Sequence, residues 1–176
     1  MVNIALVGLR ASGKSTIGRL LAAALEFPLV DTDELVSAGF HESTVTDIWR
    51  VHGEAAWRDA EAATADSVLS SEDQVISMGG GMPVIPGVGL RMRREQEEDR
   101  LLVAYLDVAL DLLEARLDAD GGDRPGLHGE AEPEDLARVH RERDGVYRSL
   151  ADVICVVPVE EPAHDTAARL LAMLTG

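Results

Sequence analysis

Short apolar runs alternate along the chain with segments whose apolar residues recur at helical spacing, as Ile17, Leu20, Leu21 and Leu25 do. Such short runs, rich in valine, leucine and isoleucine, are typical of strands buried on both faces of a parallel sheet. The pattern predicts five strands, at residues 3–8, 27–32, 74–79, 101–107 and 152–157. It predicts helices at residues 14–26, 44–52, 54–70, 109–118 and 164–174.

The order of these elements predicts an α/β fold built on one parallel sheet. Strands separated by helices need crossover connections, which place helices on both faces of the sheet. Ligands of such sheets gather at the carboxyl ends of the strands. The 176 residues suit one domain of this kind.

The charge of the chain limits its partners. A formal net charge of −16 disfavours nucleic acid and anionic membranes, because the long-range field repels phosphates. No apolar stretch approaches the roughly 20 residues of a membrane span, and no signal peptide precedes the first strand. We therefore expect a cytoplasmic protein. The single cysteine, Cys155, lies in the apolar run VICVV and is expected to be a buried, inert thiol.

The stretch GLRASGKST, residues 8–16, matches the phosphate-binding pattern G-x-x-x-x-G-K-[ST] and holds the only lysine of the chain. It follows a predicted strand and opens a predicted helix, which is the context that this motif requires. Its backbone N–H groups and the helix N-terminus can hold phosphate oxygens. The lysine can reach the β- and γ-phosphates, and the serine hydroxyl can join the shell of a Mg²⁺ ion. The residues expected to bind ATP are Gly8, Ala11, Ser12, Gly13, Lys14, Ser15 and Thr16.

Two carboxylates, Asp31 and Asp33, follow the second predicted strand. Two residues apart in an extended segment, they would leave the same face of the chain. One could hold Mg²⁺ through water, and the other could accept a proton from an attacking hydroxyl. The alternative is that Asp33 only caps the following helix. A GTPase would not need the second carboxylate, so the pair favours a kinase.

Arginines in two later motifs could bind an anionic acceptor. Arg58 and Glu61 share one helix face in WRDAE, and Arg143 and Tyr147 are four residues apart in RDGVYRS. The spacing of Arg58 and Glu61 is also typical of a surface ion pair, and neither pair alone indicates a binding site. If both arginines meet near the second aspartate, they would hold a carboxylate or phosphate bidentately. The run Gly79–Gly81 indicates close approach of a ligand or of backbone, with a tight turn as the alternative.

Residues 118–135, with four glycines and two prolines, break the alternating pattern. A structureless stretch of this length is usually functional or disordered, and we interpret it as a lid. Arg124 within it could close over the transferring phosphate and exclude water, or it could be a solvated loop arginine. The five histidines have no metal-ligand spacing, and no chemistry is assigned to them.

With these motifs in order, the chain resembles the shikimate kinases along nearly its whole length. The resemblance rests on GLRASGKST, DTD, WRDAE, GGG, RPGL and RDGVYR, which occur in the order and at about the spacing of that family. It implies a three-layer P-loop kinase fold of the nucleoside-monophosphate-kinase type. Its parts would be a central five-stranded parallel sheet, a helical substrate-binding region and a mobile lid. The core would be about 1–32, 71–117 and 150–176, the substrate-binding region about 33–70 and the lid about 118–135.

The resemblance also implies the reaction and the role of each matching residue. ATP would phosphorylate the 3-hydroxyl of shikimate, with Mg²⁺, in the route to aromatic amino acids, and the protein would act as a monomer. Lys14, Asp33 and Arg124 match the catalytic residues, and Ser15 and Asp31 (through water) match those near the metal. Residues at the positions of the shikimate contacts are Asp33, Arg58, Gly79, Gly80, Gly81 and Arg143. Arg116 and Arg124 match arginines on the ATP side.

Three departures from the family pattern bear on lid closure and turnover. The lid reads RPGL where Arg-Pro-Leu is usual, and acidic residues crowd around it. Ala11 stands where glycine is common, and Met82 stands where a smaller residue is usual. The alternatives are a gluconate-type kinase, which would not be expected to carry this acceptor site, and a catalytically impaired shikimate-binding module, which would need neither a base nor a metal site. A nucleotide kinase fits less well, because nothing in the sequence indicates a base-recognition pocket.

Overall fold

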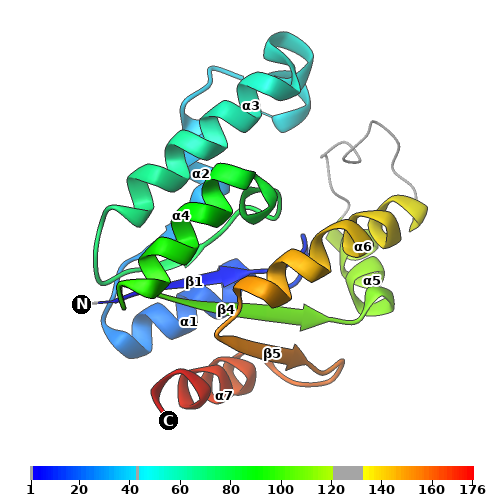
Figure 1. Cartoon of the computed structure of the whole chain (residues 1–176). Helices are drawn as coiled ribbons and strands as arrows, with labels where there is room; N and C mark the ends of the chain where they lie inside the picture. The colour runs from blue at the N-terminus through cyan, green and yellow to red at the C-terminus, as the bar shows by residue number, and fades with distance from the viewer. Residues whose placement is uncertain (1, 43, 121–132) are drawn as a thin grey trace.

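A five-stranded parallel sheet forms the centre of the protein, as predicted (Figure 1). The computed structural model describes residues 2–42, 44–120 and 133–176. The strand order is β2-β3-β1-β4-β5, and every neighbouring pair is parallel. The strands are β1 (Asn3–Val7), β2 (Leu29–Asp31), β3 (Val75–Ser77), β4 (Leu101–Val108) and β5 (Val153–Val157).

Helices cover both faces of the sheet and make three layers (Figure 1). Helices α1 (Lys14–Leu25) and α7 (Ala163–Thr175) pack together on one face. Helices α4 (Pro86–Glu97) and α6 (Pro133–Leu150) lie on the other, and α3 (Val45–Leu69) packs against α4. The remaining elements are α2 (Thr32–Ala38), α5 (Leu110–Asp120) and the short 3-10 helix η1 (Met82–Val84).

The parallel register brings the carboxyl ends of three strands to one edge. Ser77 of β3 pairs with Leu6 of β1 and with Asp31 of β2. All five residues of β1 are buried, since β1 is central and covered on both faces. The loops that leave β1, β2 and β3 therefore start side by side.

Cys155 is fully buried, as predicted, and burial raises the pKa of its thiol. None of the helices within the described ranges is long and apolar enough to cross a membrane.

Several parts of the sequence prediction are wrong. The predicted helices include neither α2 nor α6. Helix α4 was not predicted, because Pro86, Gly87 and Gly89 in its first turn resemble a loop, although proline is well suited to a helix start. The predicted lid is also too long at both ends, since residues 118–120 belong to α5 and residues 133–135 to α6. The remainder of that stretch, with Arg124, lies outside the described residues.

The predicted helices at 44–52 and 54–70 are the two halves of α3. Thr44 caps the first half by accepting a hydrogen bond from the backbone N–H of Asp47 at 3.1 Å. The halves meet at Gly53, which has φ 81° and ψ 164°. This backbone conformation is essentially restricted to glycine, so the kink between the halves depends on this residue.

We expect Gly53→Ala to destabilise the protein by about 1–3 kcal/mol, because alanine is strained in this conformation. No atom lies within 4 Å of the position a Cβ would take, so steric overlap adds nothing. The control is Gly145→Ala, equally open but inside helix α6, where alanine should stabilise by about 0.5–1 kcal/mol. Urea unfolding followed by circular dichroism measures both changes. A Gly53→Ala protein as stable as the parent would contradict the kinked helix.

Candidate active site

The phosphate loop joins β1 to α1 and encloses the ammonium group of Lys14. Gly8 and Gly13 have φ angles of 149° and 96°, and Ala11 adopts φ 62°. Lys14 Nζ donates hydrogen bonds to the carbonyl oxygens of Gly8 at 3.0 Å and Leu9 at 2.8 Å, and to Ser12 Oγ at 3.5 Å. A compact ammonium with several donors suits this group of acceptors.

Side-chain oxygen atoms from α1, β2 and β3 meet beside this loop. Ser15 Oγ donates to Asp31 Oδ2 at 2.6 Å and lies 3.3 Å from Ser77 Oγ. Two hydroxyls and a carboxylate are hard oxygen ligands of the kind that Mg²⁺ prefers, and Mg²⁺ commonly keeps several waters as well. The donor set therefore fits a hydrated magnesium ion.

Asp31 and Asp33 do not share an extended segment, contrary to the sequence prediction. Helix α2 begins at Thr32, and Asp31 caps it by accepting a hydrogen bond from the backbone N–H of Asp33 at 3.1 Å. The alternative considered from sequence was that Asp33 caps this helix, but the capping residue is Asp31. The helical turn separates the two carboxylates, so that Asp31 faces Ser15 while Asp33 borders the glycine run that follows β3.

The three glycines after β3 lie beside three different charged side chains, and two of these side chains approach closely. A Cβ at Gly79 would lie 2.5 Å from Asp33 Oδ1, and one at Gly80 would lie 3.5 Å from Arg143 Nη1. A Cβ at Gly81 would overlap Arg58 Nη1. The run is anchored because the N–H of Gly79 donates to Thr32 Oγ1 at 2.8 Å and the carbonyl of Gly80 accepts from Tyr147 Oη at 2.5 Å. Gly79 and Gly81 therefore allow close packing that a side chain would disturb, whereas a Cβ at Gly80 would make only ordinary contacts.

Arg58 and Arg143 come together from α3 and α6 on either side of this run. Arg143 is 9% exposed, and Arg58 pairs with Glu61 at 2.7 Å and with the more exposed Glu54 at 3.1 Å. Glu61 is only 2% exposed. Burial raises the pKa of its carboxyl, and this effect exceeds the opposing influence of Arg58. Together the two guanidinium groups suit a carboxylate or phosphate.

Two cavities adjoin beside the phosphate loop and Asp33. The larger has a volume of about 770 Å³ and is lined by the phosphate loop, Asp31, Ser77 and Arg116. The smaller, about 130 Å³, is lined by Arg58, Glu61, Arg143, Gly80 and Gly81, among others. Among the residues described, only Arg10, Lys14 and Asp33 line both cavities.

Most of the residues singled out from sequence lie at one of these cavities. Arg116 donates from Nη1 to the carbonyl of Ala11 at 3.2 Å, beside the loop, whereas Arg124 lies outside the described residues. Several lining residues were not predicted: Arg10, Val45, Trp49, Trp57, Ser77, Leu136, Val139, Glu161 and Thr166. The spacing of Val45, Trp49 and Trp57 by four and eight residues could have revealed an apolar face of α3, but the intervening Gly53 hides it.

Comparisons with known proteins agree with this arrangement. The family model described as shikimate kinase matches residues 10–175. The chain is 37% identical to shikimate kinase 2 of Escherichia fergusonii over 151 residues, which is 85% of this chain and 80% of that protein. It is 33% identical to the shikimate kinase of a Synechococcus species over 174 residues, 99% of this chain and 85% of that one. The solved structure of shikimate kinase from Acinetobacter baumannii in complex with shikimate is similar with a TM-score of 0.85 at 27% identity, and the match covers 99% and 93% of the two chains.

The raised pKa of Glu61 predicts a loss of acceptor affinity on the acid side. As the pH falls, Glu61 takes up a proton before an ordinary glutamate would, and Arg58 then loses its buried charged partner. We expect the KM of the acceptor to rise toward acidic pH in the parent protein. In Glu61→Gln the KM should already be raised near neutral pH and should lack this added rise.

Steady-state kinetics between about pH 5 and pH 8 test this, a range that spans the acid side of a raised carboxyl pKa. Glu54→Gln is the control, since it removes the exposed partner of the same arginine and should keep the pH dependence. Identical pH profiles for the parent and Glu61→Gln would contradict the assignment.

Proposed function

The chain belongs to the shikimate kinase family, and we propose that the residues shared by its two cavities transfer the γ-phosphoryl group of ATP to the 3-hydroxyl of shikimate. The sequence left two alternatives open, a gluconate-type kinase and a catalytically impaired shikimate-binding module. We propose shikimate kinase activity in place of both. The reaction belongs to the route to aromatic amino acids.

The observation that carries the proposal is the junction of the two cavities at Lys14 and Asp33. A phosphoryl group must pass from a nucleotide to a hydroxyl without leaving the protein, so both substrates must border the same few atoms. A cavity of about 770 Å³ beside a phosphate loop suits a nucleotide, and one of about 130 Å³ suits a small polar acid.

Shikimate is an acid with several hydroxyls, and the smaller cavity offers groups for both features. We assign its carboxylate to Arg58 and Arg143, which are held in place by Glu61 and by helix α6. The backbone of Gly79–Gly81 would approach the ring closely, because no side chain intervenes. Arg116 would lie on the nucleotide side, beside the phosphate loop.

The chemistry then follows from the positions of the charged groups. Asp33 accepts the proton of the 3-hydroxyl as its oxygen attacks the γ-phosphorus, and the bond to the β-phosphate oxygen breaks to release ADP. Lys14 stays with the phosphate oxygens and offsets the negative charge that develops on them. Ser15 and Asp31 would hold Mg²⁺, which supplies further neutralisation of the phosphates.

The remaining assignments concern the lid, the oligomeric state and the location of the protein in the cell. We assign Arg124 to the transferring phosphate on the strength of its position in the sequence. We assign a monomeric state on the resemblance to the family. The need for ATP supports a cytoplasmic location.

We expect Asp33→Asn to lower kcat by roughly 100-fold or more, because asparagine cannot accept the proton. The dissociation constant of Mg-ATP should change little, since the phosphate loop and the metal ligands remain intact. Asp59→Asn on α3 is the matched control, an exposed carboxylate that should leave activity unaltered. ADP formation and calorimetric titration with a non-hydrolysable ATP analogue provide the two measurements.

An Asp33→Asn protein with full activity would remove the proposed base. A variant that loses nucleotide binding along with activity would instead place Asp33 on the nucleotide side only.

A further inference from the structure

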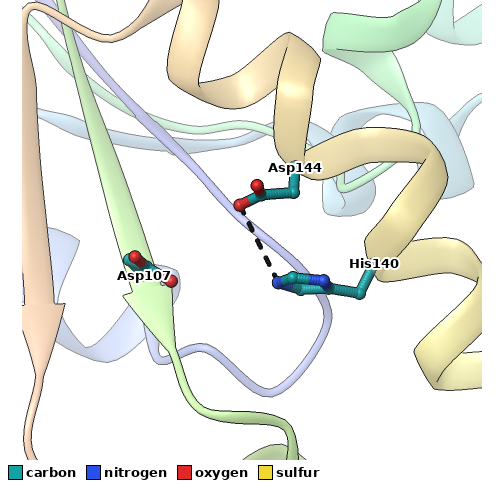
Figure 2. Close-up of side chains that lie close together, drawn as sticks. All are labelled: Asp107, His140 and Asp144. Carbon is teal, nitrogen blue, oxygen red and sulfur yellow. Dashed lines mark ion pairs between the residues drawn. The ribbon is translucent and has the colours of Figure 1, made fainter.

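Two faces of helix α6 make contacts with the rest of the protein, and only one of them borders the smaller cavity, where we place the acceptor. Arg143 and Tyr147 face the glycine run, where Tyr147 Oη donates to the carbonyl of Gly80. His140, Asp144 and Arg148 recur every four residues on an adjacent strip of the helix. This second strip faces the carboxyl end of strand β4 (Figure 2).

Two hydrogen bonds join this strip to β4. Tyr105 Oη donates to Asp144 Oδ1 at 2.9 Å, and Arg148 Nη2 donates to Asp107 Oδ2 at 2.6 Å. Arg148 Nε also lies 3.0 and 2.9 Å from the two carboxylate oxygens of Asp144. Burial of Asp144 opposes its ionisation, yet the bonds from Arg148 and Tyr105 hold its pKa below the ordinary value. The carboxylate therefore stays charged and bonded over the working pH range.

The ring of Tyr105 connects the two faces of α6. Its centroid lies 5.3 Å from that of Tyr147, and the guanidinium carbon of Arg148 lies 5.5 Å from it on the other strip. A rotation of α6 that broke the contacts of Asp144 would also shift Tyr147 and its neighbour Arg143, because both belong to the same rigid helix.

We propose that Asp144 and Arg148 are positioning residues that fix the rotation of α6 on β4 and so hold Arg143 against the acceptor. This inference rests on the proposed function, in which Arg143 binds the acceptor carboxylate. The side chain of Arg148 is 43% exposed, and exposed ion pairs contribute little stability. Arg148 instead bridges two carboxylates, Asp144 on α6 and Asp107 on β4, and so adds a directed contact between the helix and the strand.

A metal site is the competing explanation for this cluster. Asp107, His140 and Asp144 place ligand atoms within 4.8 Å of one another, and Figure 2 shows His140 and Asp144 reaching from α6 toward the strand that carries Asp107. However, Arg148 bonds to both carboxylates, so a cation already occupies the space between them. His140 Nε2 lies 3.8 Å from Asp144 Oδ1, beyond hydrogen-bond distance. The network is thus complete without an ion.

A double-mutant cycle on Asp144→Ala and Arg148→Ala tests the proposal. Each single change should raise the KM of shikimate roughly fivefold or more, while the KM of ATP stays within about twofold. The double variant should be no worse than the more affected single variant, because both changes break one coupled contact. Arg148→Lys should restore part of the affinity. Arg141→Ala, on the exposed side of the same helix, is the control and should match the parent.

Any of the following results would overturn the inference. Equal increases in both KM values, or a lower unfolding temperature with unchanged kinetics, would make the network merely structural. Equilibrium dialysis that finds one Zn²⁺ bound to the parent and none to His140→Ala would make the cluster a metal site. A parent protein inactive with shikimate would refute the proposed function itself, whereas an active parent with unaffected variants would refute only this inference.

Discussion

The parallel register of β1, β2 and β3 is the constraint on which the site depends. Because Leu6, Asp31 and Ser77 are aligned across three neighbouring strands, the phosphate loop, the cap of α2 and the glycine run all begin at one edge. A shift of one residue in either pairing would turn the outgoing side chains to the other face of the sheet. It would also separate Ser15 from Asp31, which are bonded at 2.6 Å. Catalytic geometry here is a consequence of sheet geometry.

The site gathers positive charge within a protein whose net charge is −16. An anionic substrate is repelled at long range, so its binding must come from short, directed contacts. In the proposed site, Arg58, Arg143 and Lys14 would supply these contacts, and each is held by named acceptors or lies close to a glycine. Burying a carboxylate without a partner is costly, which explains why Arg58 accompanies the buried Glu61.

Much of this arrangement could be predicted from local sequence. The five strands follow from short apolar runs, the phosphate loop from its glycines and lysine, and the break in α3 from Gly53. Two kinds of feature could not be predicted. The first is a boundary, such as the start of α2 at Thr32, where two aspartates fit a strand end and a helix cap equally well.

The second is any contact between residues distant in sequence. Tyr105 and Asp144 are 39 residues apart, and Asp107 and Arg148 are 41 apart, so no local spacing indicates that they meet. Glu61 illustrates the same limit in another way. Its spacing from Arg58 predicts an ion pair, but only the packing of α3 shows that its carboxylate is buried. Helix α4 was not predicted for a reason that is local in sequence, because its first turn carries residues that usually mark loops.

In the proposed function the two cavities hold ATP and shikimate, and the phosphoryl group passes between them at Lys14 and Asp33. The most direct measurement is the rate of ADP formation by the purified protein with Mg-ATP and, in turn, shikimate, gluconate or no acceptor. The account predicts strong stimulation by shikimate alone. Stimulation by gluconate, or ADP formation that no acceptor increases, would contradict it.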